Sequence, residues 1–256
     1  MKVRAYLKQQ IESKGSIHMT LLDPDKTSPE DSKIIASIAE EAGTSAIMIG
    51  GSLGVTESTV SQVIDAVKEE TNVPVILFPG SLSGLSPKAD AVWFLSVLNS
   101  TNPYYIVGAQ AAGAVIIRRH GLEAIPLAYI IVGQGGAAGY VSYARPVPFN
   151  KPEIAAAYAL AAQYMGFEYV YLEAGSGMPP VPPYFIKVVR RAINIPLVVG
   201  GGIKSYELAY KAAKAGANIV VTGTVVEEVD PNKLRKVLSS IVKGVHEGGR
   251  DRAKEP

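Results

Sequence analysis

The chain has 256 residues, of which 48% are hydrophobic and 25 are glycine, and this composition excludes a disordered polypeptide. Its 25 basic and 23 acidic residues leave a net charge of +2 without a basic stripe, so we expect no nucleic-acid partner. There is no cysteine, no signal-peptide apolar core and no apolar run of about 18 residues. The sequence therefore predicts a soluble, cytoplasmic protein without disulfides, thiolate metal sites or a transmembrane segment.

Short apolar runs alternate along the chain with amphipathic stretches. The runs show no polar alternation, which is typical of parallel strands covered on both faces. Eight such runs separated mostly by helices predict a single α/β domain, a (β/α)8 TIM barrel, which usually has about 250 residues. The expected strands are Ser16–Leu22, Ala46–Ile49, Val75–Phe78, Ala91–Val97, Ile125–Val132, Tyr169–Leu172, Leu197–Val199 and Ile219–Val221. The expected helices lie between Ser28 and Gly43 and at Glu57–Glu70, Lys151–Met165, Tyr184–Ala192, Ser205–Ala215 and Asn232–Val245.

Polar residues follow the first two strands. The first strand ends in LLDPDK, and the alternation of side chains directs Asp23 inward at the mouth of the barrel. Acidic oxygens that leave room for water and substrate phosphates suit Mg²⁺. Asp-Pro also starts turns, so a turn without a metal stays open as an alternative. The second strand ends in Gly50-Gly51-Ser52, a glycine turn that brings a hydroxyl to the mouth.

Three segments depart from the regular alternation. Only PGSLSGLSPKAD separates Phe78 from Ala91, so we expect a loop in place of the third crossover helix and a gap in the outer ring. The aromatic and proline-rich stretch Tyr140–Phe149 predicts a long loop on the catalytic face. The barrel domain is expected to cover residues 1–246, and residues 247–256 are expected to form a polar, frayed C-terminal tail.

The sixth strand continues into YLEAGSG. Alternation places Tyr171 and Glu173 on one face, and a carboxylate at the C-terminal end of a barrel strand is typical of a catalytic residue. Gly175, Ser176 and Gly177 offer further hydrogen-bond donors to an anion. The alternative is that Glu173 is a solvated loop acid.

Glycine turns also follow the last two strands. The seventh strand runs into GGGI (200–203), and the eighth runs into TGT (222–224). Loops at these two places in barrels often bind phosphate through backbone N–H groups, and glycine lets the backbone approach the anion closely. The alternative is that the glycines only make tight turns. The pattern indicates a phosphate and does not specify a reaction.

Together, LLDPDK, IMIGGS, YLEAGSG, VVGGGI and TGT resemble the geranylgeranylglyceryl phosphate synthases, an archaeal prenyltransferase family similar to the bacterial heptaprenylglyceryl phosphate synthases. The resemblance covers essentially the whole chain, and the missing third helix agrees with it. It implies an enzyme that joins sn-glycerol 1-phosphate to geranylgeranyl diphosphate and releases diphosphate. That reaction forms the first ether bond of archaeal membrane lipids.

The resemblance also implies a role for each matching position. Glu173 is the expected general base, and Asp23 and Ser52 are the expected ligands of Mg²⁺. Asp25 stays open as a further ligand, because bacterial relatives can have an uncharged residue there. The glycerol phosphate is expected to bind Tyr171, Leu172, Glu173, Ala174, Gly175, Ser176 and Gly177, with its phosphate on Gly201, Gly202, Gly223 and Thr224.

A C20 prenyl chain needs a long apolar groove, since each buried CH₂ contributes about 0.8 kcal/mol. We place this groove in the gap left by the third helix, with the small residues 108–113 as a wall and Trp93 and Tyr129 nearby. Phe or Trp in place of Ala111 or Ala112 is therefore expected to favour shorter donors.

Several alternatives stay open. The same chemistry with a longer donor fits the same motifs. A phosphosugar isomerase or aldolase would need an inward lysine or a second acid/base residue at a strand end, and Lys26 is the only obvious candidate. A prenyl-lipid or phosphate carrier would lose no turnover in Glu173→Gln. We expect a homo-oligomer, with at most transient contact with a membrane surface. The aromatics of Tyr140–Phe149 are candidates for either an interface or a lid.

Overall fold

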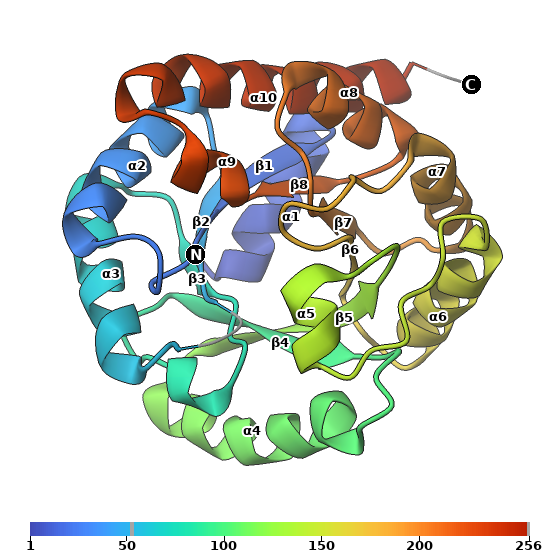
Figure 1. Cartoon of the computed structure of the whole chain (residues 1–256), viewed down its shortest axis with the longest axis horizontal. Helices are drawn as coiled ribbons and strands as arrows, with labels where there is room; N and C mark the ends of the chain where they lie inside the picture. The colour runs from blue at the N-terminus through green and yellow to red at the C-terminus, as the bar shows by residue number, and fades with distance from the viewer. Residues whose placement is uncertain (52–53, 255–256) are drawn as a thin grey trace.

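Parallel strands close into a barrel in sequence order, and the last strand pairs with the first (Figure 1). The structure is a computed structural model that describes residues 1–51 and 54–254. The expected TIM barrel is confirmed, with strand ends within two residues of those predicted. The strands are β1 (Ile17–Leu22), β2 (Ala46–Ile49), β3 (Val75–Leu77), β4 (Ala91–Val97), β5 (Glu123–Ile131), β6 (Tyr169–Glu173), β7 (Leu197–Gly200) and β8 (Ile219–Thr222).

Helices surround the strands and start where the sequence supplies caps. In α2, the Ser28 side chain accepts a hydrogen bond from the Asp31 backbone N–H, Pro29 occupies the first turn, and Gly43 ends the helix with φ +94°. No described helix has both the length and the apolarity to cross a membrane. The helices are α1 (Val3–Lys14), α2 (Pro29–Ala42), α3 (Glu57–Glu70), α4 (Ala109–His120), α5 (Gly136–Val141), α6 (Pro152–Tyr164), α7 (Pro183–Ala192), α8 (Tyr206–Ala215), α9 (Thr224–Glu228) and α10 (Pro231–Arg252).

Alternate strand residues face two different cores. One core fills the barrel interior and contains Met19 and Tyr171, whereas the other lies between strands and helices and contains Leu172. Helix α1 covers the N-terminal ends of the strands: Leu7 packs among the interior residues, and α1 lies behind the barrel in Figure 1. The open end, called the mouth below, is therefore the one formed by the C-terminal strand ends.

The barrel has a seam between β3 and β4. A single 3₁₀ turn (η1, Leu82–Gly84) stands between these strands, which confirms the expected loop in place of a crossover helix. Within the described chain, β3 pairs with β4 only at Ile76↔Ala91 and Leu77↔Val92, whereas β4 pairs with β5 along its whole length. The second half of β4 therefore has no strand partner on its β3 side.

Two segments are more helical than the sequence predicted. The Gly-rich stretch before the irregular loop forms α5, so only the part of Tyr140–Phe149 after Val141 is loop. Helix α10 continues to Arg252, so the prediction of a frayed tail from residue 247 is wrong for residues 247–252. The reason is tertiary: the Arg252 guanidinium donates to the carbonyls of Gly15 (2.7 Å) and Ala213 (3.0 Å), which holds this polar end against the barrel.

Candidate active site

Glu173 lies at the end of β6 with its carboxylate inside the mouth. Its side chain is 7% exposed, which excludes the solvated loop acid. Its Oε1 accepts a hydrogen bond from the Gly175 backbone N–H (2.7 Å), and its Oε2 accepts one from the Tyr129 hydroxyl (3.1 Å). Burial raises the pKa of Glu173 above its usual range, and these two hydrogen bonds partly oppose the shift. The group is thus a positioned carboxylate whose basicity is increased, as a general base requires.

Tyr129 belongs to this site and not to the wall of the prenyl groove expected from the sequence. It stands directly beside Tyr171 in the β5–β6 register, and the two rings lie edge to face with centroids 5.1 Å apart. Burial, together with the nearby Glu173 carboxylate, raises the pKa of Tyr129 well above its usual value, so the hydroxyl stays protonated and donates. The contact between Tyr129 and Glu173 depends on the register in which β5 pairs with β6, so it does not follow from local sequence.

A glycine pocket lies beside Glu173, between the ends of β6, β7 and β8. Gly201 and Gly202 have φ values of +89° and +71°, which favour glycine, and Gly223 precedes the start of α9. Backbone N–H groups at such turns and helix starts bind anions. The structure brings together most of the predicted acceptor residues here, and it adds Lys204, which was not predicted from the sequence although it directly follows GGGI. The pocket is lined by Leu21, Tyr171, Glu173, Ser176, Gly201, Gly202, Ile203, Lys204, Val221, Thr222, Gly223 and Thr224.

Four other predicted acceptor residues line neither this pocket nor the mouth. The side chains of Leu172 and Ala174 are buried between the strands and the helices, so only their main chain is near the mouth. Gly175 is buried with φ +100° and packs against the backbone of Gly136, at the start of α5. Gly177 is exposed, also with a positive φ. These glycines shape the loop after β6.

Gly201→Ala is expected to weaken anion binding in the glycine pocket by at least tenfold. A Cβ at this position would lie 2.9 Å from Glu173 Oε1 and 2.8 Å from the Gly175 nitrogen, and the φ of +89° strains any other residue. Titration calorimetry with inorganic phosphate and with glycerol phosphate measures the loss. The control is Gly121→Ala, also at a positive φ but in open space. Equal binding by the two variants would contradict the prediction.

Acidic residues dominate the opposite side of the mouth. Asp23 Oδ1 accepts a hydrogen bond from the Asp25 backbone N–H (3.1 Å), and its Oδ2 lies 3.6 Å from the Lys26 ammonium. Lys26 also pairs with Glu227 of α9 at 3.1 Å. A cavity of about 300 Å³ is bounded by four carboxylates, those of Asp23, Asp25, Glu173 and Glu227, and by one cation, Lys26, among the residues that the structure describes. Ser52 lies outside the described residues.

This charge pattern fits a site for Mg²⁺. An anionic ligand would be repelled by the surplus of carboxylates unless a cation neutralised it. No group of three or more His, Cys, Asp or Glu side chains able to hold a metal occurs in the described part of the chain. Mg²⁺ is commonly bound by one or two carboxylates plus water and substrate phosphates. Asp23, with Asp25 beside it, provides such oxygens.

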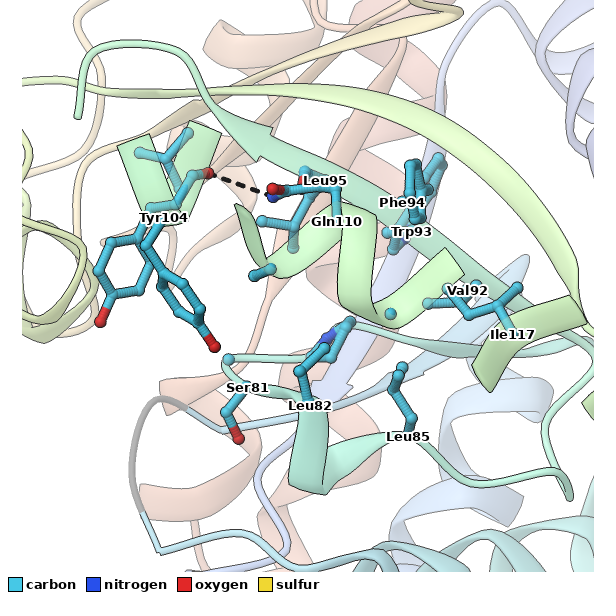
Figure 2. Close-up of a pocket in the computed structure, with 16 residues that line it drawn as sticks. Ser81, Leu82, Leu85, Val92, Trp93, Phe94, Leu95, Tyr104, Gln110 and Ile117 are labelled. Atoms are coloured by element: carbon cyan, nitrogen blue, oxygen red, sulfur yellow. Dashed lines mark hydrogen bonds between the residues drawn. The ribbon is translucent and has the colours of Figure 1, made fainter. Parts of the chain in front are cut away.

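An apolar side groove opens on the flank of the barrel, where the third helix is missing. Figure 2 shows its walls: Leu82 and Leu85 come from the η1 loop, and Phe94 and Leu95 come from β4. The third wall is α4, which presents Ala109, Gly113 and Ile117, one helical turn apart. The prediction that Ala111 and Ala112 form the wall is wrong, because both are exposed on the other face of α4. Trp93 does line the groove, as expected.

The side groove and the mouth cavity adjoin each other and share part of their walls. Both are lined by Pro79 and Gly80 after β3, by Leu95 and Val97 of β4, and by Tyr105. These residues lie at the seam, where β4 has lost its pairing to β3. The Leu95 carbonyl accepts a hydrogen bond from Gln110 Nε2 of α4 instead (2.6 Å). An apolar groove therefore borders the polar mouth at the seam.

Helix α5 borders the mouth from above. Ala137, Ala138, Val141 and Ser142 line the mouth cavity. The segment that follows is tied to the end of β4, since the Arg145 backbone N–H donates to the Asn99 carbonyl at 2.8 Å. Figure 1 shows α5 and α9 over the barrel end. Of the two roles considered for the aromatic segment, this position favours a lid over an interface.

Comparison with known proteins places these features in a family. The model of the PcrB family matches residues 8–241. Geranylgeranylglyceryl phosphate synthase of Thermofilum pendens is 58% identical over 254 residues, covering 99% of each chain, and that of Caldivirga maquilingensis is 54% identical, covering 97% of this chain and 93% of the relative. The crystal structure of (S)-3-O-geranylgeranylglyceryl phosphate synthase from Thermoplasma acidophilum with sn-glycerol-1-phosphate is 40% identical with a TM-score of 0.91, covering 96% and 99% of the two chains. This chain therefore belongs to the PcrB family.

Proposed function

We propose that the protein is a prenyltransferase that joins sn-glycerol 1-phosphate to geranylgeranyl diphosphate, forming geranylgeranylglyceryl phosphate and diphosphate. The observation that carries this proposal is the position of Glu173, which lines both the glycine pocket and the mouth cavity. A base at that junction reaches the acceptor on one side and the donor on the other. The relatives named above and the solved complex with sn-glycerol-1-phosphate support the choice of substrates.

The acceptor fits the glycine pocket. Its phosphate would meet the turn at Gly201 and Gly202 and the start of α9 at Gly223 and Thr224, where backbone N–H groups favour an anion. Lys204, which lines the same pocket, adds a positive charge. With the phosphate held there, the glycerol part extends toward Glu173. Ser176 lies on the same route and offers a hydroxyl.

The donor fits the mouth cavity and the side groove. Its diphosphate would lie beside Asp23, Asp25 and Lys26, and its apolar chain would run through the seam toward Gly113. Asp23 would hold Mg²⁺, together with Ser52 as the family resemblance implies. When bound, Mg²⁺ supplies Lewis-acid neutralisation of the departing diphosphate.

The transfer forms one bond and breaks another. The glycerol hydroxyl oxygen bonds to C1 of the prenyl chain, the bond from C1 to the diphosphate oxygen breaks, and diphosphate leaves with the electron pair. Glu173 takes the hydroxyl proton, for which its raised pKa suits it. Tyr129 and the Gly175 N–H fix the carboxylate for this step.

The geometry disfavours a phosphosugar isomerase or aldolase. Lys26, the candidate lysine for such chemistry, lies at the rim in ion pairs with Glu227 and Asp23, and its side chain is half exposed. A donor longer than C20 is the alternative that the assay below tests. A homo-oligomer is likewise part of the proposal, whereas the cytoplasmic location and transient membrane contact stay predictions.

The decisive test is incubation of the protein with sn-glycerol 1-phosphate and C15, C20 or C35 prenyl diphosphates, with and without Mg²⁺. We expect transfer that is fastest with C20 and that EDTA abolishes. Faster transfer from C35 would replace the proposed donor by the longer one. No transfer from any of the three donors would overturn the proposed reaction.

Tyr129→Phe is expected to move the acid limb of the pH profile of kcat/KM to higher pH. Glu173 must be ionised to act as a base, so activity rises as pH passes its pKa, which already lies above the usual value. The Tyr129 hydroxyl donates to the carboxylate and stabilises the ionised form, so its removal raises this pKa further. Rates at a series of pH values across this limb measure the shift. The opposite direction would contradict the assigned donor role.

A further inference from the structure

Three aromatic rings pack together beside Glu173. Phe78 follows the last residue of β3, and its ring stacks on the Tyr171 ring, with centroids 5.5 Å apart and planes inclined by 19°. The Tyr129 ring meets the Phe78 ring nearly at right angles, with centroids 5.6 Å apart. Both tyrosines are buried, and the Tyr129 hydroxyl donates to Glu173. These three side chains, called the aromatic cluster below, therefore connect the end of β3 to the proposed base.

Phe78 is the member of the aromatic cluster that borders both parts of the proposed donor site. Its half-buried side chain lines the mouth cavity, and the next two residues, Pro79 and Gly80, line both this cavity and the side groove. Tyr171 covers one face of the Phe78 ring, so the surface left toward the mouth is the other face with its edge. A donor whose chain lies in the groove and whose diphosphate lies beside Asp23 would bring its C1 past this surface.

The backbone of Phe78 is fixed by its neighbour strand. The Phe78 N–H donates to the Ile49 carbonyl at the end of β2 (2.8 Å), so the pairing of β2 with β3 extends to this residue. Gly50 packs so closely against the Phe78 carbonyl that a Cβ there would collide with it. Together with the two tyrosine rings, these contacts hold the Phe78 ring in place before a ligand arrives. Such preorganisation is what a group that stabilises a transition state requires.

The proposed transfer creates positive charge on the prenyl chain. As the bond from C1 to the diphosphate oxygen lengthens, the electron pair leaves with the oxygen, and C1 shares a positive charge with C3 of the allylic system. The face of an aromatic ring attracts a cation, most strongly where water is excluded. Phe78 offers such a face at the place where C1 would lie, and it carries no proton or lone pair that could react with the cation.

We propose that Phe78 is a catalytic residue that stabilises the developing allylic cation through the open face of its ring. Tyr171 and Tyr129 act as positioning residues, since one stacks behind the Phe78 ring and the other meets it at an angle. The inference rests on the proposed prenyl transfer, because a donor that does not ionise at C1 has no need of this surface. The alternative is that Phe78 fills space as part of the cavity wall.

The test replaces Phe78 with mono-, tri- and pentafluorophenylalanine by nonsense-codon suppression. Fluorine nearly preserves the shape of the ring but withdraws electron density from its faces, so the attraction for a cation falls stepwise. We expect the single-turnover rate constant with the C20 donor to fall at each step and to be about 30-fold lower in the pentafluoro variant. Phe78→Leu should lose about as much. The dissociation constant for the C20 donor should change by less than about threefold, because the charge develops only in the transition state.

The matched control is the same fluorinated series at Phe185. This residue of α7 is fully buried between the strands and the helices, where its ring packs against Phe149 with centroids 5.9 Å apart. It lines neither the mouth cavity nor the side groove. We expect single-turnover rates within about threefold of wild type in this series. Thermal melts show which variants are folded, and the mono- and trifluoro variants preserve the trend if a pentafluoro variant does not fold.

A binding measurement keeps this inference separate from the proposed reaction. Farnesyl trimethylammonium carries a fixed positive charge on the atom attached to C1, and the hydrocarbon with a tert-butyl group in its place has the same shape without the charge. With inorganic diphosphate present, we expect wild-type protein to bind the ammonium at least about tenfold more tightly than the hydrocarbon. Pentafluorophenylalanine at Phe78 should remove most of this preference.

Two patterns of results would overturn the role of Phe78 and leave the reaction standing. They are rates with the C20 donor that do not depend on fluorine at Phe78, and an equal dependence on fluorine at Phe185. If no variant and no wild-type protein transferred a prenyl chain, the reaction would fall and the catalytic role with it. An ammonium preference that still depended on fluorine at Phe78 would then leave this residue as part of a cation-binding site.

Discussion

Glu173→Gln is expected to lower kcat by about 10²–10⁴-fold, the usual contribution of a general base. Glutamine preserves the shape of the side chain and can still accept a hydrogen bond from Tyr129 or the Gly175 N–H. The glycine pocket stays intact, so the dissociation constant for sn-glycerol 1-phosphate should change by less than about threefold, within the range of a weakly perturbed hydrogen bond. Steady-state kinetics and titration calorimetry on the same preparation separate the two effects.

The same variant distinguishes the enzyme from a carrier. A carrier would bind both ligands without turnover, in the wild type as in the variant. Turnover within tenfold of the wild type would remove Glu173 from the role of base, whereas lost binding would make it a binding residue. Glu70→Gln is the matched control, because it makes the same substitution at the exposed C-terminal end of α3, away from the mouth.

Gly113→Leu is expected to shift donor preference from C20 toward C15. A Cβ at Gly113 would lie 3.1 Å from Leu82 Cδ2, so a leucine there occupies the side groove. If it displaces two or three CH₂ groups of the prenyl chain, the loss is about 2 kcal/mol, or about 30-fold in kcat/KM for the C20 donor. The shorter donor should lose much less. Ratios of kcat/KM for C15 and C20 diphosphates measure the shift.

Ala112→Leu is the matched control for this groove variant. It adds similar bulk to the preceding residue of α4, but on the exposed face of the helix. Gly113→Leu also improves helix propensity, by about 1 kcal/mol, so a loss of activity is not expected to come from unfolding of α4. A thermal melt checks this point. Similar losses with both donors, or a similar shift in Ala112→Leu, would show that the chain does not pass Gly113.

The sequence predicted the features that depend on strand periodicity. In a strand, a side chain points either into the barrel or away from it, so alternation from Tyr171 was enough to place Glu173 inside. The short interval between Phe78 and Ala91 was enough to predict the missing helix, because a crossover helix needs more residues. Both predictions needed only local sequence.

The remaining features depend on geometry that local sequence does not contain. The stretch around Ala111 and Ala112 is so uniformly small that its composition does not reveal which helical face is buried, and the groove lies against Ala109 and Gly113 instead. The contact of Tyr129 with Glu173 requires the β5–β6 register. Arg252 looks solvent-exposed by composition, yet it bonds carbonyls from distant parts of the chain. Ser52 and the bound Mg²⁺ stay predictions.

The seam between β3 and β4 has a consequence for how the molecule moves. A barrel whose strands are all paired must break several hydrogen bonds to open anywhere, but here the pairing stops at Leu77 and Val92. We expect native-state hydrogen exchange to be fastest, among the barrel strands, for amides along this seam. If the strands separate transiently at this seam, the amphiphilic product would leave through the flank of the barrel, with its apolar chain first and its polar head group last. The opening between β3 and β4 would then also be the route by which the product leaves.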